Sequence, residues 1–172
     1  MRFEKVTDKQ YIKDVIGDDS VNFEIMSAVI DEYNNIKLPQ RAHYGDAGYD
    51  FFAPTDIILD IGQTVKVATG IRVILDDDKF LAIVPRSGLG FKYRLQLDNV
   101  IGIIDSMYCE SDNEGHIFCK MTNDGRQGKR VEIKKGQAFA QGIIMKYFTV
   151  DDDEVNTEKR NGGFGSSDKE RK

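Results

Sequence analysis

The segment PRSGLG at residues 85–90 combines residue types that bind phosphate. Arg86 offers a planar fork of donors, Ser87 offers a hydroxyl, and Gly88 lets backbone N–H groups approach an anion closely. The apolar residues ending at Val84 predict a strand that leads into this segment. Pro-Arg-Ser-Gly also forms ordinary turns at strand ends. Taken alone, the segment therefore leaves a phosphate site and a simple turn as two open interpretations.

Asp105 lies in NVIGIIDSMY at residues 99–108, directly after the apolar pair Ile103 and Ile104. A carboxylate at the end of an apolar run is a candidate general base, although Asp also opens many turns. The residue follows the PRSGLG segment closely in the chain. We therefore expect one hairpin to set this carboxylate beside a phosphate bound at Arg86.

NGGFGSS at residues 161–167 is a glycine-rich segment with a single aromatic residue, Phe164. Glycines supply hinge freedom and backbone donors, and a flat phenyl ring can stack on a nucleobase. A disordered terminus is the commoner interpretation of such a composition. The segment is thus a candidate lid that a ligand would order.

Cys109 and Cys119 are the only cysteines in the sequence. With His116 between them they match no closed set of zinc ligands. A strand over residues 117–121 would bury Cys119 as a reduced thiol. We expect His43 and His116 to be surface or hydrogen-bonded side chains rather than metal ligands.

The elements that must position these residues are mostly strands. Short runs of apolar, β-branched and aromatic residues separated by turn-forming residues are typical of a barrel or jelly roll. The 16 Gly and 3 Pro of the sequence also favour strands joined by turns over a helical bundle. The expected strands cover residues 21–30, 57–59, 64–75, 80–84, 95–104, 117–121, 131–133 and 138–148.

A chain of 172 residues, 40% of them hydrophobic, is long enough for one sizeable core. Residues 7–16 predict a short helix, because Thr7 and Gln10 fit a capping box and Gly17 can end it. We expect an all-β domain over residues 21–150, an N-terminal appendage containing this helix over residues 1–20, and a flexible C-terminal arm over residues 151–172.

The net charge of −5, from 29 acidic and 24 basic residues, argues against nucleic-acid binding through a general basic surface. No stretch approaches the roughly 18 apolar residues that span a bilayer, and MRFEKVTDKQ lacks the apolar segment of a signal peptide. We expect a soluble cytoplasmic protein that binds neither nucleic acid nor membranes. An anionic ligand would need a local positive site or a metal.

The three segments, in this order, resemble motifs of the trimeric dUTPase family, and two further segments complete its set of five. AGYDFF at residues 47–52 resembles the first motif and GQAFAQG at residues 136–142 the fourth. The resemblance runs from about Leu38 to Ser167. It implies a distorted β-barrel or jelly roll and a homotrimer with active sites between subunits. It also implies Mg²⁺-dependent hydrolysis of dUTP to dUMP and pyrophosphate, which keeps uracil out of DNA.

The resemblance further implies roles for individual residues. Asp105 would deprotonate the water that attacks the α-phosphorus, and Asp50 would hold Mg²⁺ through water. Tyr108 would pack under the deoxyribose and exclude a 2'-hydroxyl. Arg86 and Gln141 are grouped with Asp105 as catalytic. The other residues implied to bind substrate are Ser87 and Gly88 at the phosphates, Asn99, Gly102, Ile103 and Ile104 in the nucleoside hairpin, and Lys159, Arg160, Phe164, Gly165 and Ser166 in the C-terminal arm.

The sequence departs from the family pattern at several positions. The fourth motif lacks the usual basic residue and has Ala138 and Phe139 after Gly136. The family usually has Arg five residues before the aromatic of the fifth motif, where this sequence has Lys159 followed by Arg160. After Tyr108, the residues CESDN intervene before Glu114 and Gly115, which we interpret as a short insertion in a hairpin loop.

Two other functions stay open on the sequence. A dCTP deaminase, alone or combined with dUTPase activity, shares the fold, and Glu114 is a possible match to its glutamate base. A nucleotide-gated trimer without catalysis would instead bind a protein partner through residues 1–20. Asp105 with Tyr108 three positions on, together with the glycine-rich arm, favours dUTPase.

Overall fold

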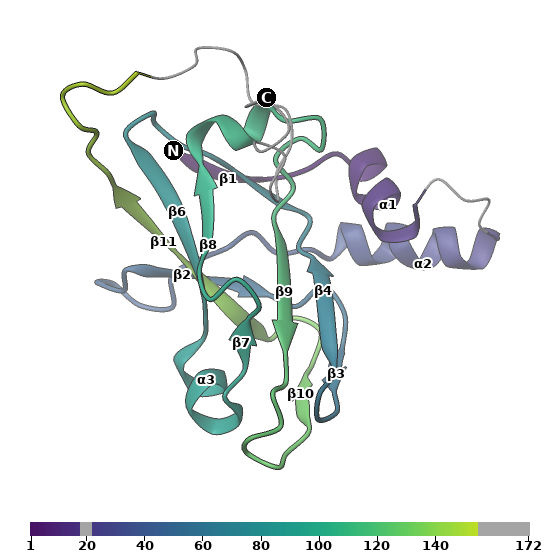
Figure 1. Ribbon diagram of the computed structural model, residues 1–172. Coiled ribbons are helices and arrows are strands. Elements are labelled where there is room, and N and C mark those ends of the chain that lie inside the picture. The colour runs from purple at the N-terminus through teal and green to yellow at the C-terminus, as the bar shows by residue number, and fades with distance from the viewer. Residues whose placement is uncertain (18–21, 155–172) are drawn as a thin grey trace, which may run out of the picture.

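The computed structural model describes residues 1–17 and 22–154, and strands form most of its regular structure (Figure 1). The strands are β1 (Arg2–Lys5), β2 (Gly48–Phe52), β3 (Ile57–Leu59), β4 (Thr64–Ala68), β5 (Ile71–Ile74), β6 (Lys79–Pro85), β7 (Gln96–Leu97), β8 (Gly102–Asp105), β9 (Phe118–Thr122), β10 (Val131–Ile133) and β11 (Ala138–Lys146). The helices are α1 (Asp8–Ile16), α2 (Phe23–Asn34), α3 (Ser87–Tyr93) and the 3-10 helix η1 (Ser106–Glu110). The predicted all-β class is confirmed.

The strand pairs of the described residues are all antiparallel. The largest sheet has the order β2-β11-β6-β8, a second has the order β4-β9-β7, and β1-β5 and β10-β3 form two-stranded pairs. Side chains alternate between the faces of a strand, so Val131 and Ile133 of β10 are buried while Glu132 between them is exposed. The buried faces of the sheets meet in one hydrophobic core.

The helix predicted at residues 7–16 is confirmed, and the capping residues act as expected. The Thr7 hydroxyl accepts a hydrogen bond from the Gln10 backbone N–H at 3.2 Å. Gly17 ends the helix with a positive φ of 86°, which glycine adopts without steric cost.

The N-terminal residues contact the β-domain through strand pairing and core packing. Strand β1, which the sequence analysis did not predict, pairs with β5 along its whole length. Val6 and Tyr11 are fully buried, so this segment contributes to the common core. A strand of four residues bounded by charged side chains carries too little period-2 signal to be recognised in sequence.

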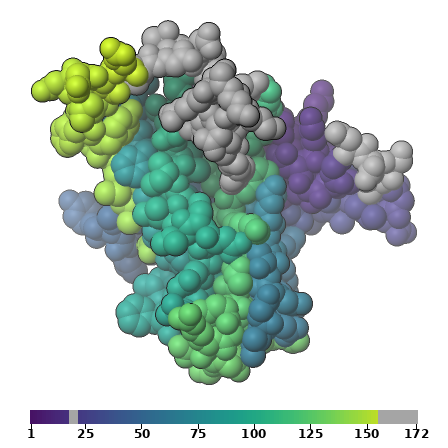
Figure 2. Space-filling model, viewed as in Figure 1, coloured from purple at the N-terminus to yellow at the C-terminus, as the bar shows by residue number. Residues whose placement is uncertain are grey.

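The strand predicted at residues 21–30 is wrong, because this segment begins helix α2. The Asn22 side chain accepts a hydrogen bond from the Ile25 backbone N–H at 2.9 Å, which satisfies one of the free donors at the helix start. The residues of α2 that turn inward, Met26, Val29 and Tyr33, recur every three to four positions, which is the helical period. Helices α1 and α2 lie together at one side of the molecule (Figures 1 and 2).

PRSGLG leads from β6 into a helix and not into a simple turn. Strand β6 ends at Pro85, Arg86 is the N-cap of α3, and Arg94 ends α3 with a left-handed φ of 54°. No helix among the described residues is long and apolar enough to cross a membrane.

Candidate active site

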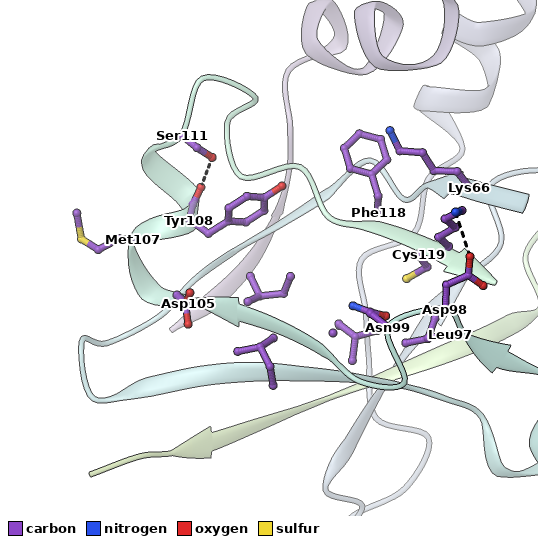
Figure 3. Close-up of a pocket in the computed structure, with 15 residues that line it drawn as sticks. Lys66, Leu97, Asp98, Asn99, Asp105, Met107, Tyr108, Ser111, Phe118 and Cys119 are labelled. Carbon is purple, nitrogen blue, oxygen red and sulfur yellow. Dashed lines mark hydrogen bonds and ion pairs between the residues drawn. The ribbon is translucent and has the colours of Figure 1, made fainter. Parts of the chain in front are cut away.

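A cavity of about 690 Å³ opens beside the turn between β7 and β8 and beside η1. Its size and mainly apolar lining with a few polar groups are typical of small-molecule sites. Six of the sequence-predicted substrate residues line it, namely Asn99, Gly102, Ile103, Ile104, Asp105 and Tyr108. Figure 3 shows Asn99 at one end of the cavity and Asp105 with Tyr108 at the other. The structure therefore brings these six residues together.

The turn that carries Asn99, between β7 and β8, is unusually tight. The Ile101 backbone N–H donates to the Asn99 carbonyl at 2.6 Å, and Val100 between them has a φ of 64°. This is a three-residue turn whose central residue is β-branched and left-handed, which is a strained combination. Gly102, the next residue, packs closely on Ile83, so a side chain there would press on the cavity floor.

Tyr108 lies in η1, and two hydrogen bonds fix its ring. Its hydroxyl donates to the His116 carbonyl at 2.9 Å and accepts from the Asn113 side-chain amide at 2.9 Å. Asn113 belongs to the residues interpreted as a loop insertion, and no role was predicted for it. Nothing in its sequence context indicates a contact to a residue five positions earlier.

Other cavity residues were also missed by the sequence analysis. Lys66 and Lys120 are register partners on β4 and β9, and both line the cavity. The Lys66 ammonium lies 4.0 Å from the Phe118 ring centroid, and Lys120 forms an ion pair with Asp98 at 3.2 Å. Only the pairing of β4 with β9, which no local pattern reveals, places these side chains at the cavity.

A second group of predicted residues meets where β2, β11 and α3 come together. Gln141 of β11 is the register partner of both Asp50 on β2 and Val84 on β6. The Arg86 Nε atom lies 3.2 Å from an Asp50 carboxylate oxygen. Gly48 makes room for Gln141, because a Cβ at position 48 would lie only 2.4 Å from the Gln141 amide oxygen.

The residues Arg86 and Ser87 also line a separate cavity of about 530 Å³ next to α3. Gly88 follows them in the first turn of α3. The first backbone N–H groups of a helix have no acceptor within the helix. The cluster of Asp50, Arg86, Ser87, Gly88 and Gln141, here called the phosphate cluster, thus offers charged and backbone donors at one place.

The expectation that one hairpin sets Asp105 beside Arg86 is wrong for a single chain. Asp105 is the register partner of Phe80 near the start of β6, whereas Arg86 follows the end of that strand. At about 3.3 Å per residue, positions 80 and 86 are about 20 Å apart. Figure 1 shows α3 and the end of β8 at opposite ends of the sheet. The linings of the two cavities share no residue.

The cysteines and His116 are structural, as the sequence suggested. Both thiols are free, and burial raises the pKa of Cys119 to about 12. His116 is fully buried and both ring nitrogens have partners. Among residues 1–17 and 22–154, no group of three or more His, Cys, Asp and Glu side chains could hold a metal ion by itself. Lys159, Arg160, Phe164, Gly165 and Ser166 lie outside the described residues.

Comparison with known proteins identifies the family. A protein-family model for dUTPase matches residues 34–168, which is more than half of the chain. The chain belongs to the dUTPase family. The deoxyuridine 5'-triphosphate nucleotidohydrolase of Lactococcus lactis subsp. lactis is 35% identical to this dUTPase over 143 residues, covering 81% of this chain and 94% of its relative.

Solved dUTPase structures share the fold of this dUTPase. The crystal structure of dUTPase from Streptococcus mutans superposes with a TM-score of 0.63 and 28% identity, covering 87% of this chain and 98% of the other. A mutant dUTPase from phage phi11 of S. aureus, in which a structural Mg(II) ion is coordinated, superposes with a TM-score of 0.58 and 21% identity, covering 70% and 90%. At that identity the second match supports the fold alone.

Glu114 does not take the position expected of a deaminase base. Its two carboxylate oxygens accept hydrogen bonds from the Thr7 backbone N–H and hydroxyl, each at 2.7 Å. It is absent from the lining of both cavities. Glu114, the residue that left a dCTP deaminase as an alternative function, thus makes a structural contact in this dUTPase.

Proposed function

We propose that this protein hydrolyses dUTP to dUMP and pyrophosphate, with each active site formed between subunits of a homotrimer. The observation that supports a site between subunits is a distance. Asp105 pairs with Phe80 near one end of β6, and Arg86 follows the other end, about 20 Å away. A base and a phosphate contact so far apart cannot act on one α-phosphate, because reacting atoms must approach to about 3–3.5 Å. The cavity of one subunit meets the phosphate cluster of another.

The cavity beside η1 binds the nucleoside. Asn99 and the backbone at Gly102 and Ile103 read the uracil edge in the tight turn. A pocket with polar groups matched to uracil rejects cytosine, whose edge would leave those groups unpaired. The Tyr108 ring packs under the deoxyribose, and a 2'-hydroxyl would clash with it.

Asp105 orients and deprotonates the attacking water. It lies at the end of β8, exposed and at the cavity, so water reaches it freely before substrate binds. The water oxygen bonds to the α-phosphorus, its proton passes to the carboxylate, and the bond to the bridging oxygen of pyrophosphate breaks. Gln141 contributes a phosphate contact from the neighbouring subunit.

Arg86 can bind phosphate while keeping its ion pair. The contact with Asp50 uses the Nε side of the guanidinium, and a guanidinium carries five N–H donors. The two terminal nitrogens stay available for bidentate contacts to phosphate oxygens. The hydroxyl of Ser87 and the backbone at Gly88 supply further donors from the first turn of α3.

Asp50 fits a magnesium site of the kind that forms with the substrate. Mg²⁺ in proteins is commonly held by one or two carboxylates, substrate phosphates and several waters. Asp50 is the only carboxylate that the described residues place in the phosphate cluster. It would contact the ion through water. Bound Mg²⁺ would screen the charge of the triphosphate and fix one conformer of the phosphates.

The C-terminal arm closes over the bound substrate. Phe164 stacks on the uracil, Gly165 and Ser166 donate to phosphates, and Lys159 or Arg160 supplies the positive charge that the family pattern has near this position. These assignments rest on the resemblance of NGGFGSS to the fifth motif. Such an arm would exclude water from the site during the reaction.

Pyrophosphate release from dUTP, dCTP, dTTP and UTP, measured in parallel with Mg²⁺ and with excess chelator, tests this function. We expect fast release from dUTP alone, and loss of release with the chelator. Ammonia release from dCTP would instead support a deaminase. No reaction with any of the four nucleotides would refute the proposed activity.

A further inference from the structure

The loop that carries Tyr108 is held from one side by the N-terminal residues. We call residues 1–17 the N-terminal brace and residues 106–117 the tyrosine loop. The brace lies outside residues 34–168, the part that matches the dUTPase family. Brace residues contact the tyrosine loop at several positions: Asp14 and the Tyr11 ring with His116, and Thr7 with Glu114. Glu4 reaches the loop indirectly, through Arg72, which binds the Cys109 carbonyl.

The contact of Asp14 with His116 fixes the proton arrangement of the imidazole. The Gly70 backbone N–H donates to His116 Nε2 at 2.8 Å, so this nitrogen is an acceptor. Nδ1 therefore carries the hydrogen and donates to the Asp14 carboxylate at 2.6 Å. With both nitrogens bonded and the side chain fully buried, the backbone of His116 cannot shift without breaking one of these bonds.

The His116 backbone is also a partner of Tyr108. Its carbonyl accepts the hydrogen bond of the tyrosine hydroxyl at 2.9 Å. The His116 ring lies against Phe118, with centroids 4.3 Å apart, and Phe118 lines the nucleoside cavity. The hydrogen bond from His116 to Asp14 of α1 thus positions a residue that contacts both Tyr108 and Phe118, two residues that line the cavity.

Glu114 closes the tyrosine loop onto the start of α1. Its backbone has a φ of 58°, which is rare for a residue with a side chain. The two hydrogen bonds to Thr7, each at 2.7 Å, hold it in that conformation. Next to it, a Cβ at Gly115 would lie 2.5 Å from the Cys109 Cα, so the loop is packed against itself without spare room.

We propose that the N-terminal brace sets the position of the Tyr108 ring and thereby the discrimination between deoxyribose and ribose. This inference rests on the proposed function, in which Tyr108 packs under the sugar. Asp14 and Glu114 are positioning residues, because they touch the loop and not the substrate. When the brace contact is lost, the tyrosine loop gains freedom, and the ring can move enough to admit a 2'-hydroxyl.

Two variants of the full chain remove brace contacts. Asp14→Ala removes the acceptor for His116, and Glu114→Gln keeps the shape of the side chain but loses one of the two acceptors for Thr7. Asp14→Asn keeps an acceptor oxygen and serves as the conservative rescue. Tyr11→Phe is the matched control, because it keeps the ring that packs on His116 and removes only the hydroxyl, which donates to Glu32 within the helix pair.

The first readout is the ratio of kcat/KM for dUTP to kcat/KM for UTP. Both values are measured on the same preparation, so the fraction of folded enzyme cancels in their ratio. A variant that is only less stable therefore keeps the wild-type ratio. We expect the ratio to fall at least about fivefold in Asp14→Ala and Glu114→Gln, and to stay near wild type in Asp14→Asn and Tyr11→Phe. Equal ratios in Asp14→Ala and Tyr11→Phe would overturn the inference.

The second readout is deuterium exchange of the backbone amides of the tyrosine loop, which needs no substrate. Exchange over residues 106–117 should be at least about tenfold faster in Asp14→Ala than in Tyr11→Phe, because the first variant opens this loop locally. Identical exchange in the two variants would show that the brace does not hold the loop. If the wild-type protein does not hydrolyse dUTP, the proposed function is refuted. The exchange measurement would still decide whether the brace holds the loop.

Discussion

Trimers assembled from two inactive variants test whether Asp105 and Arg86 of different subunits form one site. Asp105→Asn removes the base but keeps the shape of the side chain, and Arg86→Gln removes the phosphate-binding guanidinium. Each variant alone should lower kcat at least about 100-fold. Because Asp105 and Arg86 lie at opposite ends of β6, each variant chain retains one complete half of a site.

The expected recovery follows from the symmetry of a trimer. In a closed ring every site joins the phosphate cluster of one subunit to the nucleoside cavity of the next. A ring that contains both variants, in either ratio, has one junction where an intact Arg86 meets an intact Asp105. We therefore expect about one third of wild-type kcat per trimer, a recovery of roughly 30-fold over either parent.

The assay uses co-expression with two different affinity tags and purification on both, so that each isolated trimer holds both variants. Pyrophosphate release is then measured at saturating dUTP. Wild-type chains carrying the two tags give the reference rate, and each variant carrying both tags gives the background. Mixed trimers that release pyrophosphate no faster than their parents would refute a site between subunits, since two defects within one site cannot complement.

Three further predictions follow from other contacts. Tyr108→Ala should raise kcat/KM for UTP relative to dUTP at least about tenfold, because the sugar loses its steric wall, and an unchanged ratio would remove Tyr108 from sugar selection. Burial lowers the pKa of His116 below 6.5 despite the opposing effect of Asp14, so the unfolded chain takes up the proton first as pH falls. The stability contributed by neutral His116 should be fully present above about pH 6.5. Below that pH it should be lost with a slope of up to about 1.4 kcal/mol per pH unit. In urea unfolding at the same protein concentration, the free energy of unfolding of His116→Gln should depend less on pH than that of the wild type. Val100→Gly should raise the free energy of unfolding by about 0.5–1 kcal/mol, because glycine adopts the left-handed φ without strain. Val100→Ala keeps a Cβ and should not raise it. Equal thermal midpoints of unfolding in the two variants would argue against strain at this position.

Local chemistry made some elements predictable from sequence. The helix at residues 7–16 could be recognised because its start and stop signals, Thr7 and Gly17, act on neighbours within a few positions. Strands β3 and β10 were predicted with their observed bounds because polar and charged residues flank a short apolar run in β3 and a short alternating run in β10. Helix α2 was missed because its apolar residues were read as one run, when only Met26, Val29 and Tyr33 share the inward face.

The arrangement of the site could not be predicted to the same extent, because it depends on strand register. Asn99 and Tyr108 flank the short strand β8 and line the same cavity, so motif spacing predicts their proximity. Asp105 and Arg86 are also near each other in sequence, but they lie at opposite ends of paired strands, which only the pairing of Phe80 with Asp105 reveals. The contact of Thr7 with Glu114 spans more than a hundred positions, and no local pattern indicates it.

The order in which the chain is synthesised gives these long-range contacts a cost in time. Residues 1–17 leave the ribosome about a hundred residues before Glu114 and His116, an interval of roughly 5–20 s at common translation rates of about 5–20 residues per second. For most of this interval β1 lacks its partner β5, and Val6 and Tyr11 have no completed core to enter. The nascent chain thus exposes an unpaired strand and apolar side chains in residues 1–17 until the strands that cover them have been made.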